Sequence, residues 1–152
     1  MAITIQSTYA TDYTRGFAGM VANGEASNRI SRTVEDAAGI AFGKAAFRGA
    51  ADHGATGTPA AGKFLGIVIA DAGVAPLTTA AADIMPQYST AGLLNEGVIF
   101  VTAGEAVVAG DQAYVTAGGV INKTLTSNTL IPAKFDETAA SGAIVRLRVT
   151  RS

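Results

Sequence analysis

Short apolar runs separated by glycine-marked turns dominate the sequence after about residue 40. They have the length of β-strands and are rich in β-branched and aromatic side chains, and the clearest are residues 64–69, 98–101, 112–115 and 144–149. Gly110-Asp111 and Ala117-Gly118-Gly119 stand where turns would lie. Runs of this kind at spacings of roughly 8–12 residues, without alternating helical segments, are typical of sandwiches and barrels. We therefore expect an all-β fold, either a β-sandwich or a jelly-roll-like barrel.

Two of these runs carry the most specific expectations. Residues 64–69 are apolar on both faces, which predicts a central strand that is covered on two sides. In residues 144–149, Val145, Leu147 and Val149 alternate with Arg146 and Arg148, which predicts a half-buried strand with a cationic outer face.

The stretches between the runs are harder to assign. Residues 40–47 indicate a strand in which Gly43 marks a bulge or a close approach of backbone. Residues 50–62 predict a loop because they contain Gly54, Gly57, Pro59 and Gly62. Residues 71–87 predict a long connection with room for one helical turn.

The first thirty residues differ in composition from the rest, so we predict an extended N-terminal arm over residues 1–30 and one β-domain over residues 31–152. The arm carries apolar and aromatic side chains among Thr, Ser, Gly and Asn, namely Ile3, Ile5, Tyr9, Tyr13, Phe17 and Met20. The alternative is a plain first strand and loop that fold onto the domain's own core.

The composition narrows the class of partner. Net charge is −1, so no basic excess is present to neutralise a nucleic-acid backbone. Charged residues make up only 15% of the chain and mean hydropathy is +0.32, which suits an exterior partly covered by other protein subunits. Abundant alanine and glycine would also raise the hydropathy, and that alternative stays open. No apolar run approaches the roughly 18 residues of a spanning helix, and the N-terminus lacks the pattern of a signal peptide.

No motif predicts catalysis, a cofactor or a metal. Residues 57–63 match the start of a phosphate-binding loop, but Phe64 stands where the loop needs Ser or Thr. The single histidine, His53, lies in a glycine-rich loop and is expected to be solvated. The carboxylates are dispersed and the chain has no cysteine. We therefore expect a protein that is not an enzyme.

Arginine is the side chain most favoured at protein interfaces among the charged types, because its planar guanidinium makes several contacts at once. The predicted interface residues are those of the arm together with five arginines, Arg15, Arg29, Arg32, Arg146 and Arg148. A solvated charged face is the alternative.

The order of the β blocks resembles a known family. Residues 34–46 (VEDAAGIAFGKAA), 64–69 (FLGIVI), 97–101 (GVIFV) and 108–115 (VAGDQAYV), followed by a glycine turn and an apolar last strand, are similar to the structural cement, or decoration, proteins of tailed bacteriophage capsids. The resemblance runs from about residue 30 to the end and rests on this order of blocks.

That resemblance implies a non-catalytic virion protein. It would bind the outside of the head, bridge major capsid proteins and stabilise the expanded shell, and it would associate with other copies of itself as dimers or trimers. Assembly would take place in the cytoplasm of the bacterial host, with no nucleic acid or membrane as partner. The alternative function is another virion component, such as a tail, fibre or baseplate module. A small β-barrel enzyme or sugar-binding module is disfavoured by the sparse titratable groups and the absence of tryptophan.

Overall fold

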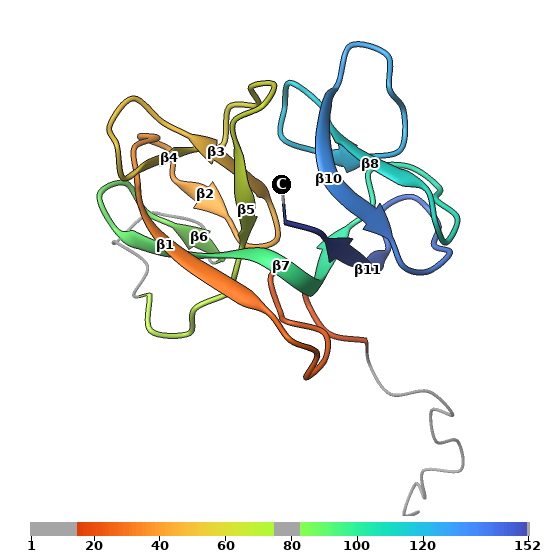
Figure 1. Ribbon diagram of the computed structural model, residues 1–152. Coiled ribbons are helices and arrows are strands. Elements are labelled where there is room, and N and C mark those ends of the chain that lie inside the picture. Colours follow the sequence, from red (N-terminus) through yellow and green to blue (C-terminus); the bar gives the residue numbers. More distant parts are fainter. Residues whose placement is uncertain (1–14, 75–82, 152) are drawn as a thin grey trace, which may run out of the picture.

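The computed structural model describes residues 15–74 and 83–151, and these contain strands and turns but no helix (Figure 1). The all-β prediction is confirmed. In chain order the strands are β1 (Asn28–Val34), β2 (Ile40–Ala41), β3 (Ala45–Arg48), β4 (Gly54–Thr56), β5 (Phe64–Val68), β6 (Ile84–Met85), β7 (Thr90–Thr102), β8 (Gln112–Val115), β9 (Ile121–Asn122), β10 (Thr129–Phe135) and β11 (Ile144–Val149).

The first half of the chain closes into a barrel, referred to below as the first barrel. Its strands follow the order β1-β4-β3-β5-β7, and β7 pairs with β1 as well, so the sheet returns to its first strand. Leu93 on β7 lies opposite Ile30 of β1 on one side and Val68 of β5 on the other. Alternate side chains point inward and form a buried cluster of Val34, Ile40, Ala46, Ala55, Leu65, Val68, Met85, Ala91 and Leu93.

The second half continues the same sheet in the order β7-β11-β10-β8-β9 and is called the second barrel. A parallel bridge between Ala103 and Ile121 brings β9 back beside the end of β7, with the Gly104 amide donating to the Ile121 carbonyl at 2.8 Å. Of the two predicted forms, the barrel is therefore the one that the strand pairings favour.

Strand β7 belongs to both barrels and runs across the middle of the molecule (Figure 1). Its first half pairs with β1 and β5 and its second half with β11. Gly97 lies between the halves with φ 128°, and a Cβ there would meet the Cβ of Ser27 at 3.0 Å. The larger core cluster takes Phe47, Ile67 and Leu94 from the first barrel and packs them with side chains of the second. The two barrels thus share a strand and the larger of the two core clusters.

The two most specific strand predictions are confirmed. β5 lies between β3 and β7, and its residues from Leu65 to Val68 are buried. β11 has the predicted alternation, because Val145, Leu147 and Val149 are 0–1% exposed.

Other expectations were wrong or incomplete. The predicted loop 50–62 contains β4, which fits beside β1 because Gly54 has no side chain to meet the Glu35 carboxylate. β6 lies within the predicted 71–87 connection. Residues 75–82, in the middle of that connection, lie outside the described residues. β10 was missed because proline disfavours a strand, but Pro132 sits at a register irregularity, where proline is tolerated. β1 begins at Asn28, just inside the predicted arm, and the division into arm and domain otherwise stays a prediction.

Candidate protein-interaction site

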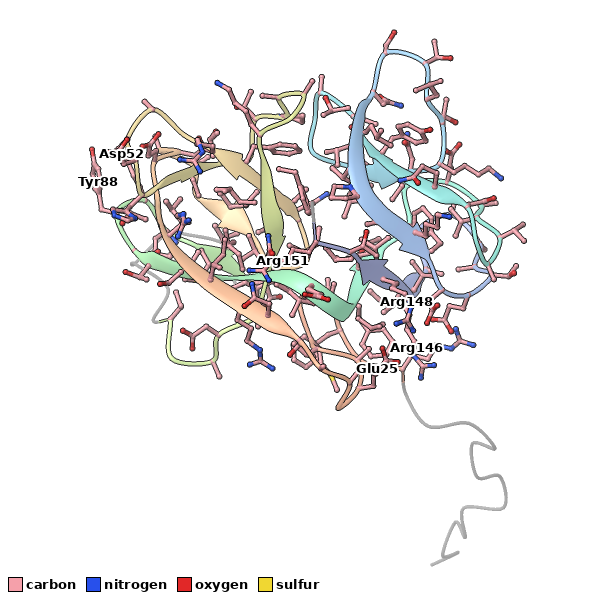
Figure 2. All side chains as sticks on the ribbon, in the orientation of Figure 1. Glu25, Asp52, Tyr88, Arg146, Arg148 and Arg151 are labelled. Carbon is pink, nitrogen blue, oxygen red and sulfur yellow. The ribbon has the colours of Figure 1, made fainter. Side chains whose placement is uncertain are left out.

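Strand β11 presents its two arginines on the surface of the second barrel. Arg146 is exposed and Arg148 partly exposed, while the residues between and beside them are buried. This arrangement follows from the two-residue period of a strand, which sends successive side chains to opposite faces. The guanidinium groups therefore lie on one outer surface, at the end of the molecule where Figure 2 labels Arg146, Arg148 and Glu25.

Arg146 stacks on an aromatic ring of the neighbouring strand. It is the register partner of Phe100 on β7, and its Cζ lies 5.6 Å from the centre of the Phe100 ring. A contact of this kind at an exposed site contributes about 0.5–1 kcal/mol. It also orients the guanidinium, because the planar group is held over the ring while its edge stays open to solvent.

Arg148 joins three segments of the chain. Its guanidinium contacts the Glu25 carboxylate at 2.6 Å and the Asp136 carboxylate at 3.2 Å. The hydrogen bond from Arg148 holds the pKa of Glu25 below its usual value, and the bonds to Glu25 and Asp136 raise the pKa of Arg148. All three groups are substantially exposed, so solvent screens the attraction. The network orients side chains more than it stabilises the fold.

The segment just before Glu25 is fixed along the free edge of β7. Phe100 accepts a hydrogen bond from the Gly19 amide at 2.8 Å and donates one to the Met20 carbonyl at 2.9 Å. Gly19 has φ 87°, and a Cβ there would meet Phe42 and the backbone of Ala70 at 2.9 Å. The close approach predicted at Gly43 is confirmed, because a Cβ at that residue would lie 2.8 Å from Ala18 Cβ.

A shallow hollow separates this segment from β11. Its volume is about 390 Å³, and it is lined by Arg15, Gly16, Met20, Ala22, Phe100, Glu137 and Arg146. Arg15 crosses its edge to the Glu137 carboxylate at 3.1 Å. We call the surface formed by Arg15, Arg146 and Arg148 with their partners Glu25, Phe100, Asp136 and Glu137 the arginine face.

The structure brings together part of the predicted set. Arg15, Arg146 and Arg148 belong to the arginine face, and Met20 lines the hollow beside them. Phe17, 59% exposed, lies in the same segment as Met20. Arg29 and Arg32 belong to β1 instead: Arg29 is exposed, and Arg32, on the other face of the strand, is partly buried and donates to the Ser31 carbonyl. Ile3, Ile5, Tyr9 and Tyr13 lie outside the described residues. As interface residues, all of these stay predictions.

The partners that complete the arginine face were not identified from the sequence. Glu25 and Glu137 lie far from their arginines in sequence, and the pairing of β10 with β11 brings Asp136 to Arg148. The sequence placed Phe100 in a strand. Its contact with Arg146 depends on β7 and β11 being neighbours in the sheet. The adjacent acids Asp136-Glu137 are a weak signal, because each points to a different arginine.

The motifs excluded on sequence grounds have structural uses. The Gly57 amide, which begins the partial phosphate-loop pattern, donates to the Asp36 carboxylate at 2.6 Å. His53 is exposed, and its carbonyl accepts from the Thr33 amide. Within residues 15–74 and 83–151, no group of three or more His, Cys, Asp or Glu side chains could hold a metal ion. The same part of the chain has no helix of the length and hydropathy needed to cross a membrane.

Comparisons with solved structures identify the fold. The chain is similar to one in a structure titled "The capsid of Myoviridae Phage XM1", with a TM-score of 0.68, 16% identity, and coverage of 97% of this chain and 98% of that one. A chain in "The crystal structure of head fiber gp8.5 N base in bacteriophage phi29" matches at a TM-score of 0.46 and 17% identity, covering 84% of this chain and 97% of that one.

A search of curated proteins finds no match. The comparison with protein families is decisive, because the matched region runs from residue 5 to residue 150 of 152. It covers both barrels, the arginine face and the β-blocks on which the sequence resemblance rested. The chain belongs to the phage structural cement protein family, described as "Structural cement protein (E217 gp24/Pam3 gp6)".

Proposed function

We propose that this protein is a capsid cement protein, which binds the outside of a tailed-phage head and bridges major capsid proteins to stabilise the expanded shell. The observation that carries the proposal is the family match over residues 5–150. In this role the protein is not an enzyme, and its location is the exterior of the virion after assembly in the host cytoplasm. Other copies of the same chain are its second kind of partner.

The arginine face supports this proposal as one contact surface. Its guanidinium groups are oriented by Phe100, Glu25 and Asp136, so little side-chain entropy is lost when a partner binds them. Each still has donor atoms beyond those used, because a guanidinium carries five N–H groups. A shell surface with carboxylates and backbone carbonyls would fit these donors. Modest affinity at each contact becomes large resistance to disruption when it is repeated over a lattice.

The predicted arm is proposed as a further contact. Ile3, Ile5, Tyr9 and Tyr13 precede Arg15 in sequence, and Arg15 belongs to the arginine face. Two truncations separate binding from folding. Deleting residues 2–14 should weaken shell binding with little change in unfolding free energy. Deleting residues 2–20 also removes Gly19 and Met20, which are hydrogen-bonded to Phe100 of β7. That deletion should lower both shell binding and the unfolding free energy.

The direct test uses expanded shells that lack the protein. Purified protein should bind them to saturation and raise the temperature at which they break open, as measured by light scattering and electron microscopy. A variant with Arg15, Arg146 and Arg148 all changed to Ala should bind more weakly. Lys123→Ala, at an exposed cation outside the arginine face, serves as the matched control. Absence of binding by the unaltered protein would contradict the proposal. Electron microscopy that locates the protein on the tail of intact virions would favour a tail, fibre or baseplate role.

A further inference from the structure

Tyr88 is the most exposed of the large hydrophobic side chains in the described residues, with 79% of its surface accessible. Its backbone lies in the left-handed region, with φ 64°. That conformation costs a non-glycine residue roughly 1–2 kcal/mol. A bulky ring that is both strained and exposed gains nothing for the fold from its side chain. Such a residue points to a use outside the isolated chain.

The backbone around Tyr88 is firmly held. The Tyr88 amide donates to the Val34 carbonyl at 2.8 Å, and the Val34 amide donates to the Ser89 carbonyl at 3.0 Å. Gln87 Nε2 adds a bond to the Glu35 carbonyl at 2.9 Å. These bonds tie the turn before β7 to the end of β1. The ring is therefore presented from a fixed base, which reduces the entropy lost on binding.

The surface beside Tyr88 is made of small residues. The Glu35 carboxylate accepts from the Ala50 and Ala51 amides at 2.7 and 2.8 Å, which holds that loop next to the same end of β1. Both alanines are exposed, and so is Asp52 after them. Figure 2 shows Tyr88 and Asp52 together at the outer edge of the first barrel. We call Tyr88 with Ala50, Ala51 and Asp52 the tyrosine tip. Because the side chains around the ring are small, a partner can approach the ring closely.

An apolar pocket lies elsewhere on the molecule, at the seam between the two barrels. Its volume is about 390 Å³, within the range of ligand pockets, and it is lined by Ala61, Gly62, Phe64, Gln112, Leu130, Ile131 and Pro132. We call it the seam pocket. Phe64 forms its wall and is braced edge-on by Phe47, with ring centres 5.9 Å apart. Leu130 at its mouth is 57% exposed.

Gln112 gives the seam pocket one directed polar group. Its Nε2 donates to the carbonyls of Ile131 and Ala133, both at 2.8 Å. This commits the amide nitrogen to the backbone of β10 and fixes which way the amide points. The amide oxygen is then the atom available to accept a hydrogen bond inside the pocket. An aromatic ring that carries a hydroxyl donor, which is the chemistry of tyrosine, suits this lining.

The charges around the two features are complementary. Lys63 is exposed between the pocket residues Gly62 and Phe64. The tyrosine tip carries the exposed carboxylate of Asp52. Within the described residues, Asp52 and Lys63 take part in no ion pair of their own. Opposite charges on the two rims would steer the surfaces together.

We propose that Tyr88 of one copy inserts into the seam pocket of a second copy. The molecule's own pocket is out of reach, because the tip lies at the outer edge of the first barrel and the seam lies between the barrels (Figures 1 and 2). A contact between two different surfaces is heterologous, so successive copies form a ring if the rotation closes. This deepens the self-association part of the proposed function, and it is testable without shells.

The first test measures self-association by sedimentation. Tyr88→Asn removes the ring while keeping a residue that tolerates the left-handed backbone, and it should weaken self-association roughly tenfold or more, the loss expected for an aromatic anchor. Leu125→Asn is the matched control, because Leu125 is 65% exposed on the second barrel and does not line the pocket. A wild-type protein that stays monomeric at millimolar concentration would overturn the proposal. So would a Tyr88→Asn variant that associates normally.

The second test uses the absence of cysteine in the natural sequence. Ala51→Cys at the tip and Ala61→Cys at the pocket leave Tyr88 intact, and a mixture of the two single variants is oxidised with copper phenanthroline and oxygen. The mixed disulfide should form several-fold faster than one between Ala51→Cys and the exposed Ala109→Cys, and adding Tyr88→Asn should abolish the difference. Equal rates for both pairings would contradict the proposal. Loss of shell binding by Tyr88→Asn with self-association unchanged would assign the tip to the shell instead.

Discussion

The two ends of β7 present opposite kinds of surface. At its second half, the arginine face is charged, and each of its three arginines already contacts a group of the same chain. Just before its first residue, the tyrosine tip offers one aromatic ring among alanines, held by backbone bonds. Charged groups that are exposed and paired chiefly set orientation and association rate, whereas a desolvated aromatic anchor contributes affinity. The contrast suits a protein that must find its place and then hold it.

The same strand links these two surfaces. From Thr90 to Phe100, β7 is hydrogen-bonded to β1 and β5 and then to β11 and the segment around Gly19. Thr90 and Phe100 are ten steps apart along the strand, which corresponds to about 33 Å. A load applied between the two ends would therefore run along one strand that is supported on both edges. Substitutions along β7 and at its two ends can show whether the ends are coupled or independent.

The largest effect is expected from Leu94→Ala. Leu94 is fully buried and belongs to the core cluster that spans both barrels. Removing its side chain should lower the unfolding free energy by about 2–5 kcal/mol. If β7 couples the ends, denaturation should remain one cooperative transition by circular dichroism and by amide exchange at both ends. Two separate transitions would show that the barrels are independent, and Leu125→Ala, at an exposed position, should change stability by less than about 0.5 kcal/mol.

Gly19→Val should have a smaller effect on stability, confined to the end of β7 that carries the arginine face. The left-handed backbone and the 2.9 Å approaches to Phe42 and Ala70 leave no room for a branched side chain. Strain of this kind costs roughly 1–3 kcal/mol. The segment from Gly16 to Ala22 should loosen, which hydrogen exchange of the Gly19 and Ala22 amides would report. Amides of Val34 and Tyr88 at the other end should stay protected; if they lose protection equally, the one-sided assignment is wrong.

The sequence predicted the fold class and the arginine end of this comparison because both depend on local patterns. Alternation in residues 144–149 is enough to place Arg146 and Arg148 outward. The closure of β7 onto β1, the pairing of Ala103 with Ile121 and the acids that meet each arginine all depend on long-range pairing that no short pattern encodes. Tyr88 was missed for another reason: its signal is a backbone angle in a turn, and tyrosine is not a residue that predicts one.

Substitutions at Tyr88 should have a small effect on stability, and the glycine variant should be more stable than the alanine variant. Glycine relieves the left-handed strain but adds freedom to the unfolded chain, so Tyr88→Gly should lie within about 1 kcal/mol of wild type. Tyr88→Ala keeps the strain and should be the less stable of the two. Paired urea denaturations of both variants measure the difference. If alanine proves equal to or better than glycine, the turn is not strained, and the case that the ring is kept for binding loses its first support.

The smallest effect concerns the acid end of the pH range at the arginine face. The hydrogen bond from Arg148 lowers the pKa of Glu25 in the folded protein. In the unfolded chain the pKa of a glutamate is about 4.3. The contribution of this pair is therefore present above that value and is lost as pH falls through the lower folded pKa. Because the pair is exposed and screened, we expect local loosening rather than unfolding. Amide exchange at Ala22 and Glu25 should accelerate at the acid end beyond its intrinsic pH dependence. Glu25→Gln should remove that excess, and Glu96→Gln, at an exposed carboxylate on β7, should not. An excess that survives Glu25→Gln would mean that Asp136 alone holds Arg148, and that the segment before β1 is anchored only by its backbone bonds to β7.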